Sequence, residues 1–346
     1  MASLPHNELV RATSRSFYLT LQVLPPAIRG QIGFAYLVAR AADTIADTEI
    51  VPINRRVEAL QKLREAVQGR NPAPLNLEDL AGKQGADGER ILLEKIGSII
   101  GELQTYSTDD QKRIRDVLAI ITGGQELDLN RFTPSAIVDP MGLPRITALE
   151  TNAELDDYTY RVAGCVGEFW TKICRAHLFP KARLDDEEFR VNGVRFGKGL
   201  QLINILRDLP ADLKKGRCYL PAEKLEKYKL SPSTLLSQVN ESRFRPLFNE
   251  YLHKAEEHLR AGWEYTNMVP FNQFRVRLAC AWPILIGIKT IEKLRVASVI
   301  ELQQGVKISR KDIRGLLAKS ILACPFSVAW KHLFPVKAVA LQENLA

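Results

Sequence analysis

Two pairs of aspartates, each with members four residues apart, constrain this chain most strongly, because they interrupt otherwise apolar sequence. Asp43 and Asp47 lie in YLVARAADTIAD, and Asp208 and Asp212 lie in QLINILRDLPAD. Residues four apart share one face of an α-helix, so each pair predicts a polar stripe along an apolar helix. The other members of the two stripes are Tyr36 and Arg40 in the first helix and Gln201 and Asn204 in the second.

Carboxylates on an inward helix face need partners, because burying an unpaired charge is prohibitively costly. Four carboxylates without nearby His or Cys favour Mg²⁺, which keeps water and completes its shell with substrate phosphates. Arg40 and Arg207 flank the acids and are expected to contact the same phosphates. The stripes therefore predict a diphosphate held through Mg²⁺. For either pair alone, a chance match on a solvated face is an equal alternative.

The rest of the chain predicts an all-α fold in one domain. Apolar residues recur at helical spacing through most of the 346 residues, and no alternating run is long enough to build a sheet. We expect a single domain over 1–346 with its core at about residues 8–330. Gly, Pro and Asn predict a surface loop at 67–88 and a helix connection at 132–147.

Two further acidic runs are assigned to helix starts and kept out of the site. Asp185 to Glu188 fit the acidic first turn of a helix, which the helix dipole favours. Asp156 and Asp157 are expected to occupy the same kind of position.

Charge and cysteine usage narrow the class of protein. The formal net charge is +8, spread along the chain, which suits a polyanionic small molecule or an anionic membrane surface. Without a basic arm, zinc spacing or binding motif, we expect no nucleic-acid partner. The five cysteines show no C-x-x-C pairing and predict reduced thiols in a cytoplasmic protein without a signal peptide. The C-terminal ILACPFSVAWKHLFPVKAVAL permits peripheral contact with the inner face of a membrane.

Four segments resemble motifs of the squalene and phytoene synthase family, in order along the chain. They are SRSFYLTLQVLP at 14–25, YLVARAADTIAD at 36–47, YRVAGCVGEFW at 160–170 and QLINILRDLPADLKKGRCYLP at 201–221. The resemblance implies an isoprenoid synthase fold, a helical bundle with a central active-site cavity. It also implies head-to-head condensation of two prenyl diphosphates, which agrees with the predicted diphosphate site.

The resemblance carries roles onto individual residues. It implies Mg²⁺ binding for the four aspartates, and a tyrosine near the reacting carbons at Tyr158, with a second at Tyr36. Residues placed around the diphosphates would be Arg15, Ser16, Arg40, Arg207, Gln201 and Asn204. Residues lining the apolar tunnel for the prenyl chains would be Phe17, Leu21, Val162 and Val166.

Two departures from the family pattern affect the predicted metal site. Ala46 and Ala211 stand where many members carry an additional acid, so the metal shell is expected to rely more on water. Pro210 removes a backbone donor and disfavours helix at Leu209. We therefore expect Asp212 to lie just beyond a kink or a helix end.

The choice of product depends on shorter segments. GRCYLP resembles phytoene-type and bacterial members, whereas FNQFRVRLACAWPILIGIKTI and GVKISRK resemble the squalene branch. The leading expectation is condensation of two farnesyl diphosphates to presqualene diphosphate and its reduction by NADPH to squalene. By the same resemblance, Lys307, Arg310 and Lys311 would contact the phosphates of NADPH. A solvated basic helix start is the equal alternative for these three residues.

Other activities remain open on the sequence alone. Without the reductive step, the product would be phytoene, dehydrosqualene or presqualene diphosphate. A terpene cyclase shares the fold and the Mg²⁺ chemistry but ionises one substrate, and a non-catalytic scaffold is a third possibility. The paired SRSF and YRVAGCVG motifs argue against a cyclase, and retention of all four aspartates argues against a scaffold.

Overall fold

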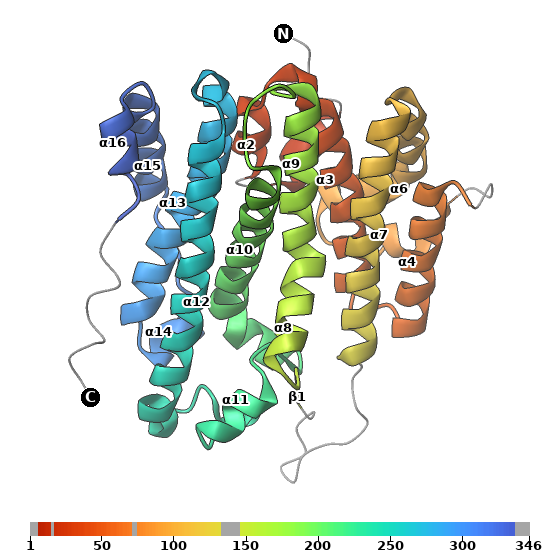
Figure 1. Cartoon of the computed structure of the whole chain (residues 1–346). Coiled ribbons are helices and arrows are strands. Elements are labelled where there is room, and N and C mark those ends of the chain that lie inside the picture. The colour runs from red at the N-terminus through yellow and green to blue at the C-terminus, as the bar shows by residue number, and fades with distance from the viewer. Residues whose placement is uncertain (1–5, 15–16, 71–74, 133–145, 336–346) are drawn as a thin grey trace.

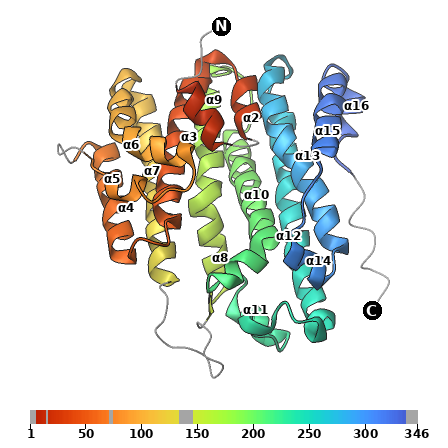
Figure 2. The same cartoon turned by 180° about the vertical axis from the view of Figure 1, so that it is seen from behind.

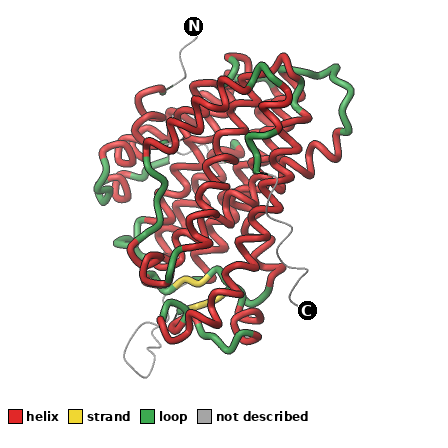
Figure 3. Tube along the Cα trace, turned by 90° about the vertical axis from the view of Figure 1, so that its left-hand side faces the viewer, coloured by secondary structure: helices red, strands yellow, loops and turns green. Residues whose placement is uncertain are grey.

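The computed structural model describes residues 6–14, 17–70, 75–132 and 146–335, and within them it is almost entirely helical (Figures 1 and 3). The all-α prediction is confirmed. The N-terminal elements are α1 (Asn7–Thr13), α2 (Phe17–Val23), α3 (Pro26–Asp47), α4 (Ile53–Gln68), α5 (Glu78–Ala81), α6 (Asp87–Gly101), the 3₁₀ turn η1 (Glu102–Thr105) and α7 (Thr108–Arg131).

The remaining elements follow the segment 133–145. They begin with β1 (Thr147–Ala148), α8 (Asn152–Thr159), the π-helical η2 (Tyr160–Gly164), α9 (Cys165–His177), α10 (Asp186–Lys214), β2 (Arg217–Cys218) and α11 (Ala222–Lys227). They continue with the 3₁₀ turns η3 (Pro232–Thr234) and η4 (Gln238–Asn240), α12 (Glu241–Met268), the 3₁₀ turn η5 (Phe271–Gln273), α13 (Phe274–Val296), α14 (Val299–Gln304), α15 (Arg310–Ala323) and α16 (Ser327–Lys331).

The long helices stand side by side and bury two apolar cores (Figures 1 and 2). One core joins α3, α4, α6, α7 and α9, and the other joins α10, α12 and α13. The only sheet in the described ranges pairs β1 with β2 in parallel, two residues each. α3 and α10 run in the same direction along the bundle, and both carry their aspartates near their C-terminal ends. The two acidic stripes therefore lie at the same end of the bundle.

The sequence predictions of helix starts and loops were partly confirmed and partly wrong. Asp185 caps α10 by accepting hydrogen bonds from the backbone of the next turn, so the acidic start at 185–188 is confirmed. The assignment of Asp156 and Asp157 to a first turn is wrong, because α8 begins at Asn152 and they lie near its C-terminal end. The loop predicted at 67–88 is shorter than expected, since it contains α5 and ends at α6, and most of 132–147 lies outside the described residues.

Pro210 does not end its helix, so of the kink and the helix end that the sequence predicted as alternatives, the helix end is wrong. α10 continues through it to Lys214, so Asp212 lies within the last helical turn. A proline inside a helix loses one backbone hydrogen bond. Pro210 and its neighbour Leu209 are both buried, and their packing in the core offsets that loss.

Close backbone packing between α10 and η2 depends on Gly197. A Cβ atom at this position would lie 2.2 Å from the carbonyl oxygen of Ala163, closer than any real contact. Only glycine lets the two segments approach this closely. Both residues also line the central cavity described below.

We predict that Gly197→Ala lowers the free energy of unfolding by about 3 kcal/mol, because the added methyl group forces two backbones apart. Gly315→Ala is the matched control, since Gly315 also lies within a helix but has open space around it. That control is expected to gain about 0.5–1 kcal/mol from helix propensity. Urea denaturation of both variants measures the difference, and equal stability would contradict this account of α10.

Candidate active site

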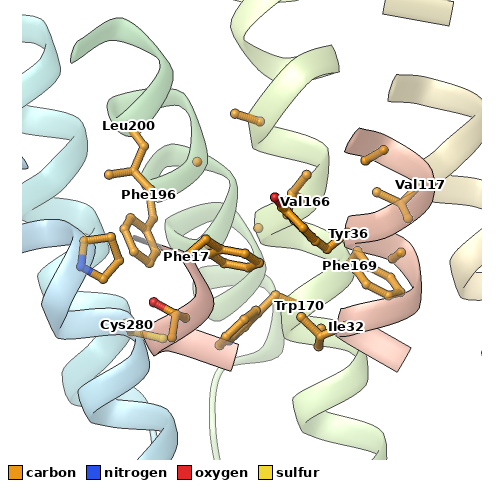
Figure 4. A pocket seen from close by; sticks show the side chains of 18 of the residues that line it. Phe17, Ile32, Tyr36, Val117, Val166, Phe169, Trp170, Phe196, Leu200 and Cys280 are labelled. Carbon is orange, nitrogen blue, oxygen red and sulfur yellow. The ribbon is translucent and has the colours of Figure 1, made fainter. Parts of the chain in front are cut away.

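A cavity of about 430 Å³ lies inside the bundle and is walled almost entirely by apolar side chains (Figure 4). α2 and α3 contribute Phe17, Ile32 and Tyr36, whose rings at 17 and 36 lie 5.0 Å apart. α9, α10 and α13 contribute residues that include Trp170, Phe196 and Cys280, and α7, η2 and α12 complete the wall. A space of this kind accepts a hydrocarbon chain and excludes water.

A polar cleft of about 280 Å³ adjoins this cavity. All four aspartates of the two stripes line it, together with Gln201, Asn204 and Tyr158. Val162 and Asn204 line both the cleft and the cavity, so one space passes into the other. The residue spacing along α3 gives the same order, from Ile32 in the apolar part through Tyr36 to the aspartates at the helix end.

The cleft holds more carboxylate charge than its own cations neutralise. Burial, reinforced by repulsion from Asp47, raises the pKa of Asp43 to about 7. Burial and repulsion from Asp208 raise the pKa of Asp212 to about 7 as well. A bound cation would reverse both effects, so this donor set fits a divalent metal of the Mg²⁺ type.

The first site residues that sequence reasoning missed lie on α7. Gln125 donates a hydrogen bond to Asp43, and Asp128 faces the same cleft one turn later. Oδ2 of Asp128 accepts a hydrogen bond of 2.9 Å from Tyr219, whereas its Oδ1 is buried without a partner among the described residues. Burial raises the pKa of Asp128 to about 6. The available signal was an amide and an acid three residues apart in a largely apolar helix, in the run GGQELDL.

The second missed group follows α10. Gly216, with φ of 77°, turns the chain back after α10 so that β2 can pair with β1. This return places Arg217 and Tyr219 in the cleft wall beside Lys215. A guanidinium nitrogen of Arg217 lies 3.8 Å from a carboxylate oxygen of Asp128. The motif GRCYLP thus supplies a cation and an aromatic hydroxyl to the acidic cleft.

The two predicted tyrosines occupy different parts of the space. Tyr158 lines the polar cleft and stacks on Tyr219 with 4.6 Å between ring centroids. Burial, then the charge of Asp128, raises the pKa of Tyr158 well above its usual value, so it is a neutral phenol. Tyr36 lines the apolar cavity and donates a hydrogen bond of 2.8 Å to the carbonyl oxygen of Thr13.

Comparison with known proteins places this arrangement in a family. The profile of the Squalene/phytoene synthase family matches residues 10–312. The chain belongs to this family.

Solved structures agree with the family's fold. The complex of TcSQS with the ligand BPH1237 superposes with a TM-score of 0.75, at 21% identity, and the match covers 97% of this chain and 92% of that one. Squalene synthase HpnC from Alicyclobacillus acidocaldarius has a TM-score of 0.58 at 18% identity, with 83% and 90% covered. The predicted isoprenoid synthase bundle is therefore confirmed.

The relatives in sequence carry more than one product name. A 15-cis-phytoene synthase from Synechocystis sp. is 30% identical, covering 72% of this chain and 66% of its own length. A squalene synthase from Cyberlindnera jadinii is 26% identical, covering 90% of this chain and 66% of its own. A presqualene diphosphate synthase from Sinorhizobium fredii is 28% identical, covering 64% and 63%. The match thus spans about two thirds of each relative.

The two predicted arginines do not line the cleft of this squalene/phytoene synthase family member. Arg40 pairs with Glu89 of α6. Arg207 donates two hydrogen bonds, of 2.8 and 2.6 Å, to the carboxylate of its neighbour Asp208. The cations in the cleft wall are Lys215 and Arg217 instead. Contact of Arg40 and Arg207 with a diphosphate remains a prediction.

Among the predicted tunnel residues, Phe17, Val162 and Val166 line the apolar cavity. Leu21 does not, because its side chain is fully buried in the core, and Thr20 lines the cavity in its place. Arg15 and Ser16 lie outside the described residues.

The predicted NADPH contacts lie apart from both spaces. Lys307, Arg310 and Lys311 are exposed around the start of α15, at the outer edge of the bundle beyond α13 (Figure 2). None of them lines the cavity or the cleft.

All five cysteines are buried and unpaired, in agreement with the prediction of free thiols. No helix within the described ranges is long and apolar enough to cross a bilayer.

We predict that the metal-free protein loses stability as pH rises from 5 to 8. The raised pKa of Asp43 means that the folded state holds a proton that the unfolded chain has released, so ionisation in this window destabilises the fold. Asp43→Asn should remove part of that dependence, on the order of 1–2 kcal/mol.

Urea midpoints at pH 5, 6, 7 and 8 in chelator measure this dependence. Asp79→Asn is the control, because Arg55 lowers the pKa of Asp79 and its carboxyl is ionised throughout that range. An unchanged slope in Asp43→Asn would contradict the assigned electrostatics of the cleft.

Proposed function

We propose that this protein joins two prenyl diphosphates head to head. The observation that carries the proposal is the continuity of an acidic cleft with an apolar cavity through Val162 and Asn204. A prenyl diphosphate has the matching shape, an anionic head on a hydrocarbon chain. Family membership supports the same reaction class.

The acidic half of the site is proposed to bind the diphosphates through Mg²⁺ held by Asp43, Asp47, Asp208 and Asp212. When bound, the metal would neutralise the leaving diphosphate. No three His, Cys, Asp or Glu side chains form a ready-made metal cluster anywhere in the described ranges. Phosphate oxygens and water would therefore complete the coordination, as is usual for Mg²⁺. Lys215 and Arg217 would add positive charge at the same place.

The apolar half is proposed to hold the hydrocarbon chains and protect the allylic cation left after ionisation. Phe17 and Tyr36 present aromatic rings to this space, and aromatic faces stabilise positive charge. Exclusion of water by the cavity wall prevents hydrolysis of the cation. Tyr158, a neutral phenol at the cleft, would relay the proton that is released when the two chains join.

The proposed substrate is farnesyl diphosphate and the proposed product is squalene. Two farnesyl diphosphates would give presqualene diphosphate, one inorganic diphosphate and a proton. Presqualene diphosphate would lose its own diphosphate, and hydride from NADPH would give squalene and NADP⁺. The longer coverage of this chain by a squalene synthase, 90% against 72% for the phytoene synthase, supports this branch.

NADPH use is proposed from the resemblance of GVKISRK at 305–311 to the squalene branch. Lys307, Arg310 and Lys311 would hold its phosphates. Their exposed position at the edge of the bundle leaves these three side chains accessible to such a ligand.

We predict that purified protein converts farnesyl diphosphate with Mg²⁺ to a C30 product, and that squalene appears only when NADPH is added. Mass spectrometry of the lipid extract identifies the product. Dehydrosqualene or presqualene diphosphate regardless of NADPH would reject the reductive step and keep the condensation. A C15 cyclic product would indicate a terpene cyclase, and no consumption of any prenyl diphosphate would support a scaffold role.

Asp43→Ala and Asp208→Ala are each expected to lower turnover at least about a thousandfold while the helical circular dichroism is kept. Asp116→Ala is the matched control, because this exposed acid on α7 pairs only with Lys112 on its own helix. Full activity in either site variant would refute the shared Mg²⁺ site.

Trp170 is expected to limit the length of the prenyl chain. It lies eight residues beyond Val162 along η2 and α9, about 12 Å from the junction with the cleft. Trp170→Ala should deepen the cavity and raise the preference for geranylgeranyl over farnesyl diphosphate at least about tenfold. Trp170→Phe keeps most of the volume and serves as control. An unchanged C40 to C30 ratio under substrate competition would show that the chains do not extend to Trp170.

A further inference from the structure

Three segments of the chain contain no acidic residue, and part of each lies at the same end of the bundle. They are 9–42, 265–291 and 313–335, and only basic residues carry charge in them. In Figures 1 and 2, α2, the turn between α12 and α13, and α15 with α16 follow one another along the end opposite the aspartates. Exposed basic residues at this end include Lys319 and Lys331.

The same end exposes large apolar side chains. Six of them are at least half exposed and define what we call the α13–α16 face: Phe271, Phe274, Ile321, Leu322, Phe326 and Val328. Leu19 lies on α2, the helix beside the α12–α13 turn, and its side chain is 42% exposed. Exposed apolar side chains that gather in one region, beside basic residues, mark an interaction surface.

Buried contacts hold the parts of this face in fixed positions. The indole of Trp330 in α16 donates a hydrogen bond of 2.9 Å to Asn267 at the end of α12. The Arg277 guanidinium lies 4.9 Å from the ring centroid of Trp330 and 5.6 Å from that of Phe271. Since α16 and the α12–α13 turn are tied through these groups, the apolar side chains form one preorganised surface.

The face also lies next to the apolar cavity. α2 turns Phe17 and Thr20 into the cavity, and α13 contributes Ala279 and Cys280. Arg275, beside the exposed Phe274, donates a hydrogen bond of 2.7 Å to the backbone of Val23 at the end of α2. Two cavity-lining helices thus also expose apolar side chains at this end, α2 through Leu19 and α13 through Phe274.

We propose that the α13–α16 face docks on an anionic lipid bilayer. Its charge complements such a surface, because Lys319 and Lys331 are exposed beside it and 313–335 contains no carboxylate. Its apolar side chains enter the region between headgroups and acyl chains, as interfacial segments do. The bilayer lies against the end of the bundle where α2 and α13 cover the cavity, which gives a hydrocarbon product a short route into lipid.

Vesicle flotation tests this proposal without any catalytic step, so its outcome is independent of the proposed function. The probes are vesicles of phosphatidylcholine alone and vesicles with 30 mol% phosphatidylglycerol, about a third anionic lipid. We expect the protein to float with the anionic vesicles. Phe271→Ser/Leu322→Ser/Phe326→Ser/Val328→Ser should lower the partition coefficient more than about a hundredfold. Lys319→Gln/Lys331→Gln should lower it about thirtyfold, at about 1 kcal/mol per charge.

The matched control is Val239→Ser/Val296→Ser, which removes two exposed apolar side chains outside the face and should leave binding unchanged. Circular dichroism verifies that every variant is folded. Failure of the wild-type protein to float with anionic vesicles would overturn the proposal, and so would equal binding of the fourfold variant. A concentration-dependent dimer in analytical ultracentrifugation that the fourfold variant abolishes would also overturn it, because a second copy would then cover the face.

Discussion

Repulsion among carboxylates in a partly buried cleft is the constraint on which the rest of this structure depends. Asp43 and Asp212 sit where burial and a neighbouring acid disfavour their ionised forms. The fold must hold these groups in place without neutralising them, because neutral or fully paired acids would bind metal and diphosphate poorly. Long helices packed in a bundle meet that requirement, since each acid is fixed by many apolar contacts along its own helix.

Arginine partners tune this charge rather than abolish it. Arg207 forms an ion pair with Asp208, and Arg40 forms one with Glu89. The cations that line the cleft are Lys215 and Arg217. The cleft therefore keeps a surplus of negative charge for a divalent cation, with cations beside it for the anion that follows. The adjoining cavity is lined by apolar side chains instead. The site therefore has a polar half and an apolar half within the length of one helix.

Much of the site was readable in the sequence because helical spacing projects residues onto one face. The four aspartates, Gln201 and Asn204 were found in this way, and the structure places them in one cleft. Asp128 escaped the same reasoning, because a single acid in a helix carries no repeat and its partner Tyr219 is 91 residues away. Contacts of that range depend on tertiary packing, which periodicity does not describe.

Errors in the local predictions have similar causes. Pro210 was expected to kink or end its helix by backbone propensity, and the helix continues through it because core packing offsets the lost hydrogen bond. Leu21 was expected in the tunnel wall, but the rotation of α2 turns Thr20 toward the cavity instead. The volume of the cavity, and therefore the length of chain that it admits, arises where seven α-helices and η2 meet, and no single helix carries a sequence signature of it.

A crystal structure with Mn²⁺ and a farnesyl thiolodiphosphate, which resists ionisation, tests the central claim most directly. The account predicts anomalous scattering from Mn²⁺ between the aspartates of α3 and those of α10, with the farnesyl chain in the apolar cavity beyond Val162 and Asn204. Metal or diphosphate bound elsewhere, or a chain lying outside the cavity, would contradict the assignment of cleft and cavity to one active site.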